Sequence, residues 1–159
     1  MDGAMNYNMT NEYKINFKKG LEYQKFIKKI FKKKYNFELN FYENIYDQYY
    51  KGETKEGFEI KFDDLLKKYN NLYIEIGEKT NKKNKEYKPS GIFRKDNTKW
   101  YVIGNYNEIW IFKKYILLNY FINLNFNKKI EIIKTTETSK GFILNLQNRT
   151  KLKQKLIKL

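Results

Sequence analysis

The sequence contains no cysteine, no histidine and only one proline. Without cysteine there is neither a disulfide framework nor thiolate chemistry, which is compatible with a reducing compartment. Without histidine, Ser-His triads, histidine-pair ribonuclease chemistry and Cys/His zinc sites are excluded. Any catalysis therefore depends on carboxylates, lysines, tyrosines and the backbone, and a hydrolase of this composition would need a hard metal ion bound by oxygen.

The chain also lacks a long apolar run. Its longest, YILLNYFINLNF at residues 115–126, is short for a membrane span and is interrupted by asparagine. The N-terminus does not show the charged-then-apolar order of a signal peptide. We therefore expect a soluble, cytoplasmic protein with no membrane partner.

Positive charge is what the chain has in excess. In 159 residues, 33 Lys and Arg stand against 18 Asp and Glu, giving a formal net charge of +15. Coding bias toward A and T explains why only two basic residues are arginine, but not the net charge, because glutamate codons are equally rich in A. An excess of this size favours a polyanionic partner, and nucleic acid is the first candidate.

Hydrophobic periodicity predicts an α/β protein with a flexible N-terminal tail at residues 1–15 and a single domain at 16–159. We expect helices at residues 17–34 and 113–124 and a short basic helix at 148–159. The expected strands are at residues 35–43, 57–63, 71–79, 99–104, 108–112 and, more weakly, in the KIEIIKT segment. A lysine-rich loop at 80–91 contains the only proline.

Carboxylates gather in the middle of this basic chain. Residues 43–79 carry nine acids and six lysines, a net charge of about −3. A solvated face of paired lysine and glutamate is the ordinary explanation for such a segment. A cation site is the alternative.

The spacing of these acids favours the cation site. Glu59, Lys61 and Asp63 alternate along one predicted strand, so their side chains share one face. Glu75 lies on the next predicted strand. If the two strands are neighbours, their polar faces converge into the arrangement that Mg²⁺-assisted phosphodiester cleavage requires: carboxylates hold the metal, and an ammonium group stabilises developing negative charge.

These residues also carry a resemblance. Asp47, followed after eleven residues by Glu59-Ile60-Lys61, resembles the PD-(D/E)xK nuclease superfamily. The longer order YD…GFEIKFD…NLYIEI…KPSGI is similar to a phage-type branch of these nucleases, over about residues 17–124. The resemblance implies a restriction-endonuclease-like core of a helix, a three-stranded meander, a helix and a further strand, with a central mixed sheet of about four to five strands flanked by helices.

The resemblance also implies roles for individual residues. Asp47 and Glu59 would be metal ligands, Lys61 the catalytic lysine, and Glu22 an accessory acid from the first helix. Two departures are plain: Tyr46 stands where the family has proline, and the tract after Asp47 is polar. Other assignments therefore remain open, with Asp63 and Glu75 as the ligand pair, or Glu53 as the first acid.

The lysine-rich loop is the predicted contact to nucleic acid. Its candidates are Lys82, Lys83, Lys85, Lys88 and Ser90, although KPSG also suits a plain turn. Residues 80–159 hold 18 basic residues and 5 acids, so the surplus charge follows the acidic segment.

The leading hypothesis is a DNA endonuclease that uses Mg²⁺ or Mn²⁺, with a homodimer left open. The alternatives are a non-catalytic nucleic-acid-binding protein, such as a decayed nuclease fold or a phage inhibitor of a host system, and a structural or interaction module.

Overall fold

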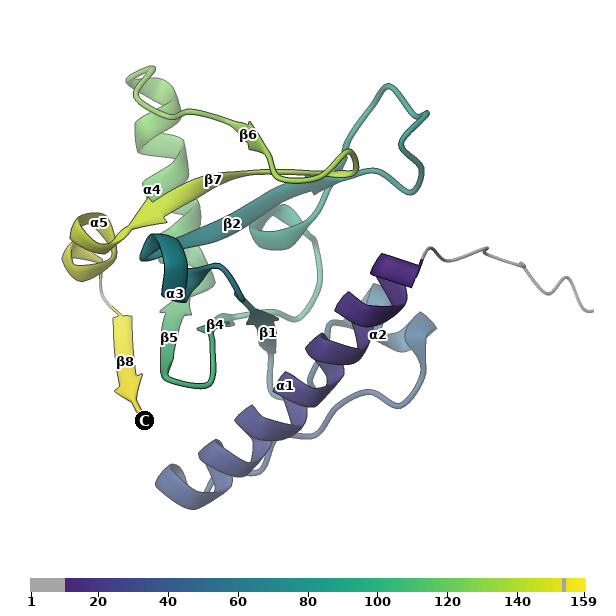
Figure 1. Cartoon of the computed structure of the whole chain (residues 1–159), viewed down its shortest axis with the longest axis vertical. Helices are drawn as coiled ribbons and strands as arrows, with labels where there is room; N and C mark the ends of the chain where they lie inside the picture. The colour runs from purple at the N-terminus through teal and green to yellow at the C-terminus, as the bar shows by residue number, and fades with distance from the viewer. Residues whose placement is uncertain (1–10, 153) are drawn as a thin grey trace, which may run out of the picture.

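Helices and strands alternate along the chain in the computed structural model, which describes residues 11–152 and 154–159 (Figure 1). In these residues the helices are α1 (Asn11–Tyr35), α2 (Ile45–Lys51), α3 (Leu66–Tyr69), α4 (Lys114–Phe126), α5 (Leu146–Lys151) and the 3-10 turn η1 (Gly91–Phe93). The strands are β1 (Phe58–Phe62), β2 (Asn71–Glu78), β3 (Lys88–Pro89), β4 (Trp100–Gly104), β5 (Glu108–Lys113), β6 (Ile133–Lys134), β7 (Ser139–Asn145) and β8 (Gln154–Lys158).

The strands form two four-stranded sheets. The first has the order β1-β4-β5-β8, and it is mixed, because β1 runs parallel to β4 while the other pairs are antiparallel. The second has the order β3-β2-β7-β6 and is antiparallel throughout. The protein is therefore of the mixed α/β class, with one mixed sheet of four strands.

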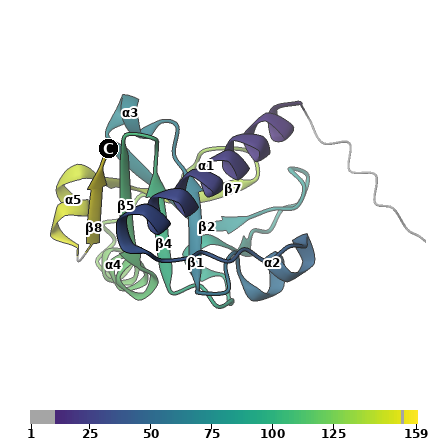
Figure 2. The same cartoon turned by 90° about the horizontal axis from the view of Figure 1, so that it is seen from below.

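Helix α1 covers one face of the first sheet (Figure 2). Its apolar stripe of Tyr23, Ile27 and Phe31 packs against strand residues such as Ile60 and Val102 in one core cluster. Its lysine-rich side stays in solvent. A second cluster lies on the other face of this sheet, where β2, β7, η1 and α4 contribute buried side chains.

Several predicted elements are confirmed, with small shifts of boundary. The segments 57–63, 71–79, 99–104 and 108–112 form β1, β2, β4 and β5, and residues 114–124 of the helix predicted at 113–124 fall in α4. The predicted helix at 17–34 lies within α1, which begins at Asn11, so residues 11–15 of the expected tail are helical. Residues 1–10 of that tail lie outside the described residues.

The strand predicted at residues 35–43 is wrong. Asn36 takes a left-handed φ of 50° just after α1 ends, and the following chain makes only an isolated bridge, Phe41 to Thr54. Leu39 is fully buried in the α1 core, while its neighbours Asn40 and Tyr42 bond to loop residues instead of to a strand. The alternating pattern thus belongs to an extended segment that covers the core.

Two further predictions fail. The basic helix expected at 148–159 continues only to Lys151, and the chain then forms β8, an edge strand on β5. The strands β1 and β2, expected to be neighbours, belong to different sheets, because β1 pairs instead with β4. The expected three-stranded meander is therefore not formed. No helix in the described segments is long and apolar enough to cross a membrane.

Candidate active site

The edge strand β1 places Glu59 and Lys61 on the sheet face opposite α1. In the parallel register Glu59 lies beside Tyr101 and Lys61 beside Ile103, and these two β4 side chains enter the second core cluster. Lys61 Nζ lies 2.8 Å from Glu59 Oε1. The carboxylate is 1% exposed, whereas the lysine side chain is 44% exposed, so the ion pair connects the interior with solvent.

Within the described part of the chain, only one of the two carboxylate oxygens of Glu59 has a well-placed polar partner, which is the Lys61 ammonium group. The Glu59 Oε2 atom is buried and accepts no hydrogen bond of good geometry from the described residues, and the nearby Tyr101 hydroxyl, which also lacks one, lies within weak hydrogen-bonding reach of Glu59. Burial, and next the charge of Glu59, raise the pKa of Tyr101, which therefore stays a neutral phenol. An unpaired buried carboxylate oxygen is costly, and either a ligand bound beside it or rotation of the Tyr101 hydroxyl toward it would remove that cost.

Glu53, in the loop between α2 and β1, is the second carboxylate of the site. Its Oε1 accepts hydrogen bonds from the backbone N–H of Ile60 at 3.2 Å and from Gln24 Nε2 at 2.9 Å. Burial raises the pKa of Glu53 to about 8, and the charge of Glu59 adds to the rise. Two carboxyl groups that repel each other in a partly dry site are typical of a functional centre.

Two cations balance these acids. The negative charge of Glu59 raises the pKa of Lys61 by more than the partial loss of hydration lowers it, and Glu75 and Glu53 contribute in the same direction as Glu59. Arg94 lines the same hollow as Glu53, Glu59 and Lys61. Its Nε bonds Asp96 at 2.8 Å and its Nη2 bonds the Gln48 carbonyl at 3.1 Å, which ties the guanidinium to α2.

Glu75 approaches from the second sheet and is held in place by hydroxyl groups. Ser90 donates to one carboxylate oxygen and Ser139 to the other, each at 2.8 Å. Gly91 has φ +53°, and a Cβ there would collide with the Glu75 carbonyl. The KPSG segment therefore packs against Glu75 and fixes its position.

A β-bulge in β2 brings Glu78 toward the same side. The register with β7 shifts between Glu75 and Gly77, which leaves Ile76 as the extra residue. Burial raises the pKa of Glu78, and the charge of Glu75 adds to this while Lys61 opposes it. Bulges next to functional sites commonly redirect a side chain in this way.

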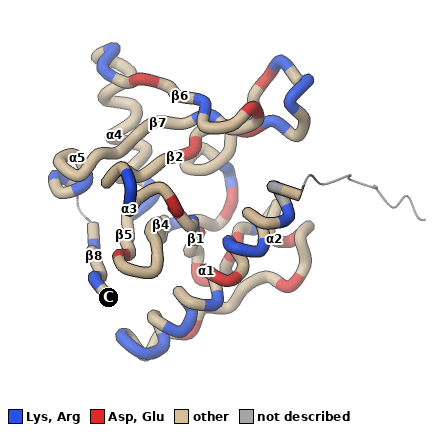
Figure 3. The backbone as a smooth tube through the Cα atoms, viewed as in Figure 1, with Lys and Arg blue, Asp and Glu red and all other residues tan. Residues whose placement is uncertain are grey.

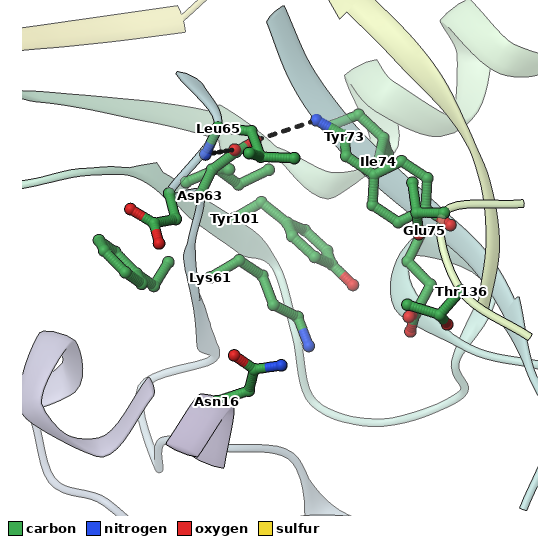
Figure 4. A pocket seen from close by; sticks show the side chains of 13 residues that line it. Asn16, Lys61, Asp63, Leu65, Tyr73, Ile74, Glu75, Tyr101 and Thr136 are labelled. Atoms are coloured by element: carbon green, nitrogen blue, oxygen red, sulfur yellow. Dashed lines mark hydrogen bonds between the residues drawn. The ribbon is translucent and has the colours of Figure 1, made fainter. Parts of the chain in front are cut away.

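Three hollows meet at Lys61. One of about 360 Å³ lies between β1 and β2 and is lined by residues that include Asp63, Glu75 and Tyr101 (Figure 4). A second, of about 320 Å³, extends toward Asn16 and Gln24 on α1. The third, of about 180 Å³, contains Glu53, Glu59 and Arg94. Lys61 is thus open to a ligand from three sides.

Two of the predicted site acids lie outside the three hollows, and a third, Asp63, lines the first hollow but has both carboxylate oxygens occupied. Asp47 is in α2, where it pairs with Lys51 at 2.8 Å and its backbone N–H is capped by Asn44. Glu22 is exposed on α1, and Gln24 occupies the side that faces Glu53. Asp63 accepts backbone N–H groups from Leu65 and Tyr73, and therefore fastens the end of β1 to the start of β2.

The loop lysines and Ser90 differ in exposure. Lys82, Lys83 and Lys85 are exposed on the projecting loop between β2 and β3 (Figure 3), and Lys88 is exposed at the start of β3. Lys82 lies 3.5 Å from Glu137. Ser90 is 1% exposed and donates to Glu75, so its role in this structure is to position a carboxylate, not to present a hydroxyl to solvent.

The donor set fits a hard divalent ion, but incompletely. Within the described part of the chain, no group of three or more acids forms a ready metal cluster. Glu59 Oε2 and Glu53 would offer two oxygen ligands to such an ion, and water with substrate phosphate would complete the shell, as is usual for Mg²⁺.

Sequence reasoning missed Arg94, Gln24, Ser139 and Glu78 as members of the site. Arg94 carried a signal, since it is one of only two arginines. The comparisons add no precedent, because the chain matches no family profile, curated protein or solved structure.

Proposed function

We propose that the chain is a Mg²⁺- or Mn²⁺-dependent deoxyribonuclease whose centre is Glu53, Glu59 and Lys61. The observation that carries the proposal is the buried Glu59 Oε2, which accepts no hydrogen bond of good geometry from the residues that the structure describes and lies near a second carboxylate of raised pKa and a lysine that reaches solvent. The net charge of +15 supplies the attraction for a polyanion.

Glu53 and Glu59 would hold the ion, which when bound supplies Lewis-acid activation of the phosphate and of water. Lys61 would bind the scissile phosphate and stabilise the negative charge that develops as water adds to phosphorus. The bond from phosphorus to the leaving oxygen breaks, giving a phosphate monoester and a hydroxyl group. Arg94 would orient the neighbouring phosphate, because a guanidinium favours paired hydrogen bonds to phosphate oxygens.

Glu75 has a different task in this proposal. Its two oxygens are occupied by Ser90 and Ser139, so it acts on Lys61 through charge and holds the ammonium group in the hollow. The resemblance to PD-(D/E)xK nucleases supports Glu59 and Lys61 in these roles, with Glu53 in place of Asp47 as the first acid.

The second candidate is a non-catalytic nucleic-acid-binding protein. It is favoured by the Glu59–Lys61 ion pair, which already occupies one ligand oxygen, and by the incomplete acid set noted above. Such a protein would bind DNA as tightly in EDTA as in the presence of Mg²⁺.

The test is incubation of the protein with circular, linear and branched DNA, with Mg²⁺, with Mn²⁺ and with EDTA. We expect metal-dependent cleavage that falls by about a hundredfold or more in Glu59→Gln, since one ligand charge is removed while the basic surface is unchanged. Glu38→Gln is the matched control, because Glu38 is an exposed acid paired with Lys28 and Lys32. Absence of cleavage with either metal, or cleavage by Glu59→Gln at the wild-type rate, would refute the proposed site.

A further inference from the structure

An aromatic slot lies on the α1 face of the first sheet, opposite the candidate active site, near the C-terminal end of α1. The helix ends at Tyr35, and the sheet beside it stays partly uncovered. The slot has a volume of about 200 Å³ and is lined by Phe31, Tyr35, Phe37, Phe58, Trp100, Ile111 and Lys155.

The rings in the slot are ordered. Phe58 and Trp100 project from adjacent strands and stack on each other, with ring centroids 6.0 Å apart and 12° between their planes. Phe31 and Phe37 meet Phe58 edge-on at 5.2 and 5.7 Å. This packing holds the two strand rings as a platform while Trp100 stays partly exposed.

Lysines surround this platform. Lys155 Nζ lies 3.9 Å from the Tyr35 ring centroid, and Lys113 Nζ lies 5.4 Å from that of Trp100. Lys33 and Lys34 stand in the last turn of α1, where Figure 3 shows a run of basic residues. None of these four lysines has an ion pair in the described segments.

The slot is separate from the candidate active site. Phe58 and Glu59 are consecutive residues of β1, so their side chains leave opposite faces of the sheet. Phe58 packs with α1, whereas Glu59 faces the region of Arg94 and Lys61. A ligand of the slot therefore does not need the carboxylates.

We propose that this slot binds an unpaired nucleobase of single-stranded nucleic acid, stacked on the face of Trp100 that is turned away from Phe58, with Lys113 and Lys155 on the flanking phosphates. Flat rings at a sheet surface, surrounded by cations, are the combination that binds single strands without reading sequence. A base pair inside a duplex cannot enter, because its faces are already stacked. The inference is independent of the nuclease proposal, since it requires neither metal nor Glu59.

The two tryptophans make the test direct. Trp110 is 1% exposed and lies under the Arg149 guanidinium, so a stacked base quenches the fluorescence of Trp100 alone. The probes are a short oligo-dT, the matching oligo-U and a blunt DNA duplex, titrated in EDTA to prevent cleavage. We expect both single strands to quench the emission and the duplex to leave it unchanged.

Substitution then measures the stacking. Trp100→Leu should weaken binding of the single strands roughly 5- to 100-fold and change duplex binding less than about twofold. Trp100→Phe should restore most of the affinity without the optical signal. Tyr69→Leu is the matched control, because Tyr69 is an exposed aromatic residue beneath Lys68, on α3 and outside the slot.

Three results would overturn the proposal. One is an unchanged single-strand affinity in a folded Trp100→Leu variant, and another is an equal loss for the duplex. The third is a concentration-dependent dimer that Trp100→Leu abolishes, which would assign the slot to a second copy of the chain. If Trp100→Leu does not fold, the double change Lys113→Gln with Lys155→Gln decides, because it should flatten the salt dependence of single-strand binding by about one to two units.

Discussion

Glu53→Gln should stabilise the metal-free protein at alkaline pH, although it removes a proposed ligand. The amide keeps an Oε1 atom that can accept the N–H of Ile60, and it resembles the protonated carboxyl in shape. At pH 5 the wild-type Glu53 is protonated, since its pKa is about 8, so the two proteins should have nearly equal stability.

The direction of the pKa shift of Glu53 decides at which pH the substitution stabilises the protein. The folded pKa is raised above the ordinary value of 4.5, so the favourable contribution of Glu53 is present below about pH 4.5 and is lost as pH rises through 8. A pKa that rises from 4.5 to about 8 on folding corresponds to a loss of at most about 5 kcal/mol in the free energy of unfolding at high pH. Because Glu53 is partly exposed, we expect about 2–3 kcal/mol at pH 9, or roughly 5–10 °C in Tm for a chain of this size.

The assay is thermal or urea unfolding in EDTA at pH 5 and pH 9. Glu56→Gln provides a control of opposite sign: burial alone would raise the pKa of Glu56, but two hydrogen bonds from Asn40 outweigh it and lower the pKa. That variant should lose stability at neutral pH. Equal stability of Glu53→Gln and wild type at both pH values would refute the account of the repelling carboxyl pair.

Metal binding should release the proton that the Glu53 carboxyl group carries below pH 8. Because Glu53 must lose it to become a ligand, apparent Mg²⁺ affinity should rise about tenfold per pH unit below pH 8. Calorimetry in two buffers of different ionisation enthalpy would detect the released proton. A pH-independent affinity would exclude Glu53 as the ligand that titrates.

Two more predictions separate structural from functional residues. Asp63→Asn should lower the free energy of unfolding by about 1–2 kcal/mol, because Asp63 accepts the N–H of Leu65 and Tyr73, while metal-dependent cleavage at permissive temperature stays within a few-fold of wild type; a folded but inactive variant would make Asp63 a ligand. Changing the four loop lysines to Gln should flatten the slope of log affinity for duplex DNA against log salt by up to about four, measured by fluorescence anisotropy in EDTA, whereas an unchanged slope would place the duplex path elsewhere. Those lysines are Lys82, Lys83, Lys85 and Lys88.

Local patterns predicted much of the secondary structure, because burial of one face leaves a period in the sequence. The stripe of α1 and the alternation of β1 and β2 were visible for this reason. Periodicity does not say which strand pairs with which. Nothing in the sequence of β1 distinguishes β2, the next strand along the chain, from β4, its actual partner.

The acids of the site show the same limit. Glu59 and Lys61 were predicted correctly as neighbours, because a two-residue spacing on a strand puts them on one face. Glu53 reaches them from a loop, where no period exists, and its place depends on the turn at Gly52, which has φ +111°. Asp47 fits the spacing of a family pattern but lies on a short helix, paired with its own neighbour Lys51.

The two arginines show what a lysine-rich composition conceals. Arg149 is fully buried, bonds the carbonyl and the side chain of Asn70, and stacks on Trp110. Arg94 donates to Asp96 and to the Gln48 carbonyl of α2, and it lines the same hollow as the acidic centre. A lysine ammonium has neither the flat face nor the forked donors for these positions. In a chain where coding bias favours lysine, the exceptions therefore mark sites that need the shape of the guanidinium group as well as its charge. One such site stabilises the fold, and the other lies at the edge of the proposed phosphate site.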